Sequence, residues 1–134
     1  MNYWLVKTEP DSYSWDDLVR DKKTVWDGVR NFQARSHLKK MEKGDVVLIY
    51  HTGDEKAVVG KAQVSKAAYP DPKDAEWVVV ELSAGKPLKK TVTLAQIKAD
   101  KRLSDMVLVR ASRLSVQPVK PSEFDLITEL SETK

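Results

Sequence analysis

The residues best suited to chemistry fall within one ten-residue stretch that begins at Trp26 and ends at Arg35. This stretch contains the indole ring of Trp26, a tight turn at 27–28 and a helix that Asn31 is suited to cap. It also contains two guanidinium groups, those of Arg30 and Arg35. The N-terminus of a helix offers unpaired N–H groups to an anion, and arginine forms charge-assisted hydrogen bonds with phosphate. An indole ring stacked on a nucleobase contributes about 1–3 kcal/mol. The stretch is typical of a nucleotide-binding site, although a core tryptophan, a simple helix cap and solvated arginines explain the same residues.

Three further segments place polar side chains beside apolar ones, and two of them lie where predicted strands end. Residues 7–9, Lys-Thr-Glu, close one apolar strand, and residues 50–53, Tyr-His-Thr-Gly, close another. Residues 110–118 alternate polar with apolar side chains and include the small hydroxyls of Ser112 and Ser115. Such side chains line clefts and let a ligand approach the backbone closely. Each segment also has a structural alternative, namely a lysine that reaches solvent, a hydrogen-bonded histidine or an exposed edge strand.

The composition of the 134-residue chain excludes several kinds of chemistry. There is no cysteine, which removes disulfides, thiolate catalysis and cysteine-based zinc sites. The two histidines, His37 and His51, match no metal-binding spacing, and the five glycines stand singly, so no phosphate-cradling loop is present. The acidic residues are likewise scattered. We therefore expect no metal, no cofactor and no catalytic residue.

Bulk properties predict one domain that spans residues 1–134. The formal net charge of +3 and the pI of about 9.0 favour an anionic partner only weakly. No apolar run is long enough to span a bilayer, and no basic segment followed by an apolar one opens the chain. We expect a cytoplasmic protein without a membrane partner; its oligomeric state stays open.

The order of predicted elements favours an α+β fold. The strand at 3–8 is apolar on both faces, which is typical of a central strand covered on both sides. Helices follow caps at Ser14, Asn31 and Thr93, and Pro121 opens a terminal helix. Five or six short strands without a βαβ rhythm favour a curled or barrel-like sheet. The other strands are predicted at 24–26, 46–51, 57–65 and 77–82.

Turns and helix faces complete the predicted fold. Pro70 and Pro72 bracket a loop, and the Gly-Lys-Pro sequence at 85–87 predicts a turn. Residues 106–109 are apolar throughout, which does not decide between a strand and a buried helix. The helix at 32–41 has a predicted apolar face made by Phe32, Ala34, Leu38 and Met41.

Together the four polar segments resemble the signature of the EVE domain, and they follow that family's order over nearly the whole chain. The block at 26–35 is the most specific of them, because a match of that length does not arise by chance. Thr8 and Thr52 stand where many relatives have serine; each keeps the hydroxyl and adds a methyl, which changes the width of a pocket. The residues that carry the resemblance are Tyr3-Trp4-Leu5-Val6-Lys7-Thr8-Glu9-Pro10, Trp26-Asp27-Gly28-Val29-Arg30-Asn31-Phe32-Gln33-Ala34-Arg35, Tyr50-His51-Thr52-Gly53 and Ser112-Arg113-Leu114-Ser115-Val116.

The resemblance implies a PUA-like fold, a bent, barrel-like mixed β-sheet of five or six strands flanked by short helices. It also implies kinship with YTH and ASCH domains. YTH modules hold a methylated base in an aromatic cage, so the expected partner is DNA or RNA with a flipped, modified nucleobase. The implied base pocket consists of Trp26, Asn31, Lys7, Thr8, His51, Thr52, Ser112 and Ser115. The side chains implied to face backbone phosphates, where they add affinity without sequence information, are Arg30, Arg35 and Arg113.

Two other functions stay open at this point. ASCH relatives include an amidohydrolase of an acylated cytidine that uses lysine, threonine and glutamate, which are the residue types at 7–9. Alternation along a strand sends Lys7 and Thr8 to opposite faces, so a shared active site needs an irregular strand end. The second alternative is a module that binds a free nucleoside or an unrelated metabolite. The sequence also leaves open the choice between DNA and RNA and the identity of the modified base.

Overall fold

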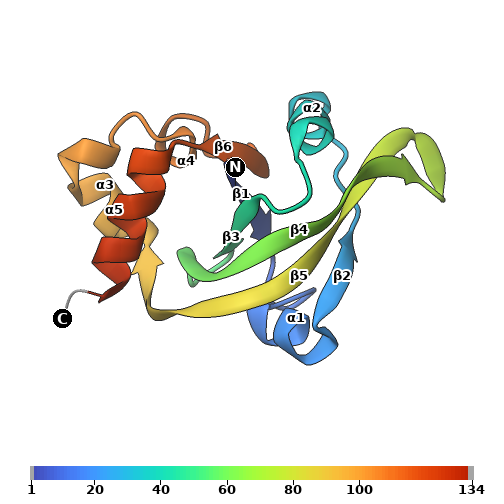
Figure 1. The fold of residues 1–134 in the computed structure, drawn as a ribbon. Helices are drawn as coiled ribbons and strands as arrows, with labels where there is room; N and C mark the ends of the chain where they lie inside the picture. Colours follow the sequence, from blue (N-terminus) through green and yellow to red (C-terminus); the bar gives the residue numbers. More distant parts are fainter. Residues whose placement is uncertain (1, 133–134) are drawn as a thin grey trace.

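A six-stranded mixed sheet forms the centre of the computed structural model, which describes residues 2–132. Its strand order is β2-β5-β4-β3-β1-β6, and the sheet is curved and open, with β2 and β6 at its edges (Figure 1). This confirms the α+β prediction and the number of strands. The strands are β1 (Tyr3–Thr8), β2 (Lys23–Trp26), β3 (Val46–His51), β4 (Ala57–Asp71), β5 (Asp74–Thr93) and β6 (Val116–Val119). The helices are α1 (Trp15–Asp21), α2 (Phe32–Lys40), α3 (Leu94–Ala99), α4 (Val107–Arg110) and α5 (Pro121–Glu132), with a 3-10 turn at Lys101–Leu103.

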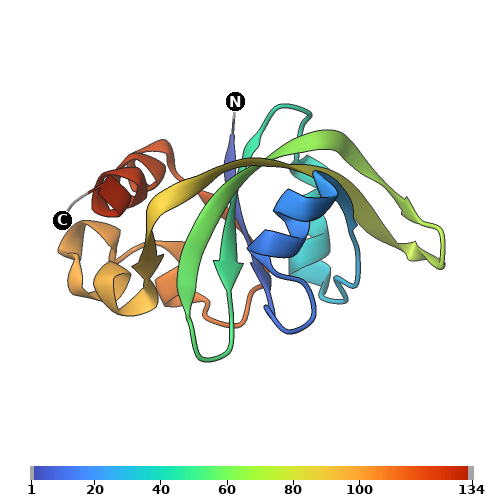
Figure 2. The ribbon, with the colours of Figure 1, turned by 90° about the horizontal axis from the view of Figure 1, so that it is seen from below.

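Strand β1 lies inside the sheet and is covered on both faces, as its apolar pattern predicts. It pairs in parallel with β3 and antiparallel with β6. Trp4 and Val6 belong to one buried cluster together with α1 and α2, whereas Leu5 belongs to a second cluster with the C-terminal helices. Figure 2 shows α1 and the C-terminal helices on separate sides of β1 and β3. None of the helices within residues 2–132 is long and apolar enough to cross a membrane.

The three predicted helix caps are confirmed. Ser14 and Asp17 form a reciprocal capping box at α1, and Thr93 and Gln96 form another at α3. Asn31 Oδ1 accepts a hydrogen bond of 2.9 Å from the backbone N–H of Ala34 at the start of α2. These local signals need no distant partner, which explains why the sequence alone predicts them.

The predicted turn at 85–87 is wrong, because these residues continue strand β5. Pro87 lies opposite Gly60 of β4 at one of several register shifts between the two long strands. A Cβ atom added to Gly85 would lie 2.4 Å from the backbone oxygen of Lys61, so Gly85 permits close approach of two strands. Pro70 and Pro72 sit at the tip of the same β4–β5 hairpin, whose outer part extends away from the body of the molecule (Figure 1).

Phe32 does not join the apolar face of α2, and its side chain is 63% exposed. Its ring instead stacks on Trp77 of the β4–β5 hairpin, with ring centroids 5.3 Å apart and an interplanar angle of 24°. The helix buries Ala34 and Leu38 against the sheet, as predicted. Because the Phe32 side chain packs on the hairpin and not in the core, the helix period alone misplaces it.

Two segments near the C-terminus resolve as helix and loop. Val107–Arg110 forms α4, which settles the ambiguity over 106–109. The predicted strand pattern over 110–118 holds only for Val116–Val119, which pairs with β1 as β6. Residues 111–115 are a loop that reaches the end of β1, where the backbone N–H of Lys7 donates to the oxygen of Ser115.

Candidate functional site

Three polar segments converge at the end of β1. The residues after β1, the β3–β4 turn and the loop at 111–115 meet at one end of the sheet (Figure 2). The backbone N–H of Thr52 donates to the oxygen of Thr8 at 2.9 Å, and the Thr52 hydroxyl donates to the same oxygen at 3.3 Å. Thr52 also donates to the carboxylate of Glu9 at 3.2 Å. The parallel pairing of β1 with β3 therefore brings two of the predicted segments together.

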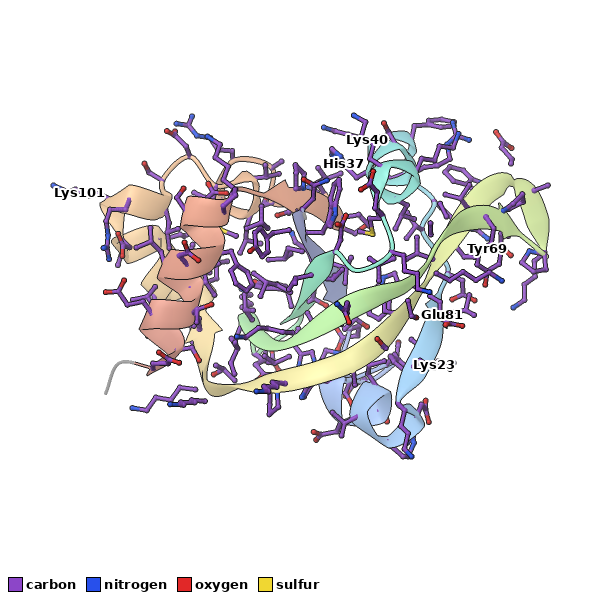
Figure 3. All side chains as sticks on the ribbon, in the orientation of Figure 1. Lys23, His37, Lys40, Tyr69, Glu81 and Lys101 are labelled. Atoms are coloured by element: carbon purple, nitrogen blue, oxygen red, sulfur yellow. The ribbon has the colours of Figure 1, made fainter. Side chains whose placement is uncertain are left out.

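A hollow at this end, named here the Trp26 cavity, has a volume of about 860 Å³. It opens between the end of β1, strand β2 and strand β5. Lys23 and Glu81, labelled in Figure 3, come from the adjoining strands β2 and β5. The lining residues are Lys7, Thr8, Glu9, Ser12, Tyr13, Lys23, Thr24, Val25, Trp26, Asp27 and Glu81.

Trp26 serves both the core and the wall of this cavity. Its side chain is 8% exposed and packs within the cluster that α1 and α2 cover. Tyr13 meets it edge to face, with ring centroids 6.3 Å apart and an interplanar angle of 86°. Trp26 therefore belongs to the core and also lines the cavity, so removing its ring costs stability as well as cavity surface.

A second hollow of about 580 Å³, the Ser115 cavity, lies on the other side of residues 7–9. It gathers six predicted site residues from three segments of the chain. The hydroxyls of Thr52, Ser112 and Ser115 stand at its wall together with cationic side chains. Its lining residues are Lys7, Thr8, Glu9, Tyr50, Thr52, Gly53, Lys56, Leu94, Ser112, Arg113 and Ser115.

Lys7, Thr8 and Glu9 form the wall that the two cavities share. The Lys7 ammonium donates to the backbone oxygen of Ser112 and lies 5.7 Å from the centre of the Tyr50 ring. Burial lowers the pKa of Lys7 below its usual range. The hydroxyl of Thr8 donates to the backbone oxygen of Tyr13 at 2.6 Å, so this side chain is already committed.

Asn31 lies beside these cavities in a shallower hollow of about 320 Å³. Gln33 lines this hollow too, and the loop at 111–114 joins it to the Ser115 cavity through Ser112 and Arg113. The oxygen of Asn31 is used as the helix cap, which leaves its NH₂ group for a ligand. The predicted residues Asn31, Ser112 and Arg113 are thus neighbours in space.

The structure does not place His51 in either cavity, which corrects its assignment to the pocket floor. The side chain is 7% exposed, and Nε2 accepts a hydrogen bond of 2.9 Å from the buried backbone N–H of Trp15. Nδ1 lies 2.6 Å from a carboxylate oxygen of Glu55. Both ring nitrogens are engaged, so His51 ties the start of α1 to the β3–β4 turn and has no free atom for a ligand.

Arg30 and Arg35 also lie away from both cavities and face the β4–β5 hairpin. Arg30 pairs with the buried carboxylate of Asp71 at 3.2 Å and lies 5.5 Å from the centre of the Trp77 ring. Arg35 donates to the backbone oxygen of Glu76 at 2.8 Å and also stacks over Trp77. In the structure Arg30 and Arg35 connect the start of α2 to the β4–β5 hairpin. This position differs from the predicted one, in which both side chains face backbone phosphates.

Several lining residues carry no signal in the sequence. Tyr13 and Glu81 belong to none of the predicted segments and meet Asp27 of the 26–35 block in the cavity that forms where β2 pairs with β5. Lys56 follows the β3–β4 turn and reaches the Ser115 cavity. Within residues 2–132 no three His, Asp or Glu side chains gather in a way that could hold a metal ion.

The profile described as EVE domain matches residues 2–130, nearly the whole chain. The chain belongs to the EVE domain family. Thymocyte nuclear protein 1 of Mus musculus is 33% identical to this EVE domain, over 99% of the chain and 75% of that relative. The family match and this relative therefore confirm the resemblance.

Solved structures match this EVE domain closely. Rpa0253 from Rhodopseudomonas palustris is 46% identical, covers 98% of this chain and 93% of its own, and superposes with a TM-score of 0.94. Human THYN1 protein, solved in complex with 5-methylcytosine-containing DNA, is 29% identical with a TM-score of 0.93, over 100% of this chain and 99% of its own. The ASCH protein from Zymomonas mobilis shares the fold alone, at 13% identity and a TM-score of 0.56, over 99% of this chain and 96% of its own.

Proposed function

We propose that this EVE domain is a nucleic-acid-binding module that holds one flipped, modified nucleobase of DNA or RNA in the Trp26 cavity. The observation that carries the proposal is the cavity itself, an open hollow of about 860 Å³ with two aromatic side chains and several polar groups at its wall. Ligand pockets have this size and this mixture of surfaces. The human relative solved with 5-methylcytosine-containing DNA supports a modified base as the ligand.

The energetics of the cavity suit a single base. Taking a base out of its stack costs a few kcal/mol, and least for a strand that is already single. Contact with the rings of Trp26 and Tyr13 offsets this cost, since stacking on an aromatic side chain contributes about 1–3 kcal/mol per base. Carboxylates at Asp27 and Glu81 supply acceptors for the amino group of a base edge. The cavity thus offers both the apolar and the polar contacts that a base requires.

A binding titration tests the proposal. Fluorescence anisotropy compares a labelled single-stranded nonamer that carries one 5-methylcytosine with the same strand that carries cytosine. A buried methyl group contributes about 0.8 kcal/mol, so we expect about fourfold tighter binding of the methylated strand. The matching duplex should bind more weakly, because its base must first be unpaired. Absence of binding to all these strands would contradict the proposal, and equal affinity for both bases would remove the modified base from it.

A second candidate, an amidohydrolase of an acylated nucleoside, is favoured by one observation. Lys7, Thr8 and Glu9 line the same two cavities, although β1 keeps a regular register with β3 through Thr8. The hydroxyl of Thr8, however, donates to the backbone oxygen of Tyr13 and not to a base that would activate it. We therefore expect no release of acetate from N4-acetylcytidine at high protein concentration. Turnover that is abolished in Lys7→Ala would replace the binding role with this one.

A further inference from the structure

We infer that the Ser115 cavity is a phosphate site, which receives the backbone phosphate next to the base held in the Trp26 cavity, and that Lys56 and Arg113 bind it. The inference rests on the proposed function and extends it to a second site. A nucleotide joins its base to a phosphate through one sugar. Since the two cavities share the wall formed by residues 7–9, a base in the first places a flanking phosphate at the second.

The net charges of the side chains that line the two cavities differ in sign. The Ser115 cavity has three cationic side chains, Lys7, Lys56 and Arg113, and one carboxylate, Glu9. The Trp26 cavity has two cations and three carboxylates. A phosphate is therefore favoured in the Ser115 cavity and disfavoured in the Trp26 cavity, whereas a neutral base with amino groups has the opposite preference.

The polar groups of the Ser115 cavity suit an anion in other ways. The hydroxyls of Ser112 and Ser115 are able to donate to phosphate oxygens, whereas the hydroxyl of Thr52 already donates within the protein. The carboxylate of Glu9 is held by the Thr52 hydroxyl at 3.2 Å and by the backbone N–H of Asp11 at 3.4 Å. These hydrogen bonds satisfy part of the hydrogen-bonding capacity of Glu9, the one carboxylate in the wall, and hold it in place.

Lys56 and Arg113 are the free cations of this region. Neither side chain has a hydrogen bond or an ion pair with any residue in the part of the chain that the structure describes. Lys56 also has a backbone φ of 47°, a left-handed conformation that lysine adopts at a cost, and its oxygen accepts a 2.8 Å hydrogen bond from the N–H of Leu94. By contrast, Arg30 and Arg35 are committed to the β4–β5 hairpin.

Neutralising single phosphates tests the inference. The probes are single-stranded DNA nonamers with one 5-methylcytosine, in which a methylphosphonate replaces the linkage on its 5′ or its 3′ side. One of the two replacements should weaken binding to the unmodified protein by about tenfold, because a charge-assisted contact is lost. Lys56→Gln and Arg113→Gln should each weaken binding of the natural strand by about fivefold to tenfold and reduce the salt slope by about 0.7. In these variants the sensitive methylphosphonate should have less than about a twofold further effect.

Lys98→Gln is the matched control, since it removes one exposed positive charge from nearby α3 without changing the lining of the Ser115 cavity. It should leave the methylphosphonate effect intact, and melting curves should show all three variants folded. The inference is overturned if no linkage is sensitive, or if the sensitivity persists unchanged in both Lys56→Gln and Arg113→Gln. Retained preference for 5-methylcytosine without a sensitive linkage overturns the phosphate site alone, whereas loss of all binding overturns the proposed function as well.

Discussion

Replacing Trp26 with leucine should weaken binding of a 5-methylcytosine-containing strand by about tenfold. The physical reason is the loss of an aromatic wall, since stacking on such a ring contributes about 1–3 kcal/mol per base. Leucine fills part of the buried volume, so the stability loss stays below the ~3–5 kcal/mol expected for Trp26→Ala. Anisotropy titrations of the variant, run well below its melting temperature, give the change in affinity.

Trp15→Leu provides the matched control for Trp26→Leu. Trp15 is buried to a similar extent, at 6% exposure, and belongs to the same cluster, but it packs over Gly60 and does not line either cavity. This variant should lose comparable stability and keep its affinity for the methylated strand within about twofold. If both variants lose affinity equally, Trp26 acts through the fold and not as a wall of the binding site.

Asp45→Asn should lower the free energy of unfolding by about 3 kcal/mol at pH 7, because it disrupts a buried carboxylate with three donors. Asp45 is 2% exposed and accepts hydrogen bonds from the Trp4 indole at 2.9 Å, the Glu42 N–H at 3.0 Å and the Asn2 N–H at 3.1 Å. Asparagine offers one oxygen where the carboxylate offers two, so at least one donor loses its partner. Urea unfolding measures the difference, with an unchanged m-value as the sign that only stability has changed.

The pH dependence of stability provides a second test of Asp45. Burial by itself raises the pKa of this carboxyl, but the hydrogen bonds from Trp4, Glu42 and Asn2 outweigh burial and lower the pKa below its usual range. A lowered folded-state pKa contributes stability that is present above the unfolded value of about 3.9 and is lost as the pH falls through the folded value. The gap between the natural chain and Asp45→Asn should therefore narrow below about pH 4. A gap that stays constant down to pH 3 would contradict this role.

The fold could be predicted where the signal is local. Strand β3, the central position of β1 and the three helix caps depend on alternation or on a side chain three residues away. The long β4–β5 hairpin could not be predicted, because Gly85 and Pro87 have a different meaning in a register shift than in a turn. Phe32 was misplaced for a similar reason, since its partner Trp77 lies 45 positions away and no helix period reveals it.

In the candidate site, too, local sequence signals could be predicted and contacts between distant residues could not. The segments at 7–9 and 50–53 end the parallel strands β1 and β3, and residues 112–115 lead into β6, which runs antiparallel to β1, so their convergence follows from the strand order once β1 is central. His51 has the residue type of a ligand-binding group, but its partner is the backbone N–H of Trp15, which no sequence pattern indicates. Lys56 has no motif of its own and enters the site only through the β3–β4 turn. Burial and unused hydrogen-bonding groups distinguish polar residues with a structural role from those that a ligand can contact. Both are properties of the fold and not of the local sequence.

The most direct test of the central claim is to locate the base by NMR. A ¹H–¹⁵N titration with a trinucleotide that carries a central 5-methylcytosine reports on every backbone amide and on each tryptophan indole. The account predicts that the largest shifts occur at the Trp26 indole N–H and at the amides of residues 7–9 and 13, with small shifts at the indole of Trp4. Shifts that cluster on α5 or on the outer β4–β5 hairpin, with Trp26 unaffected, would contradict it.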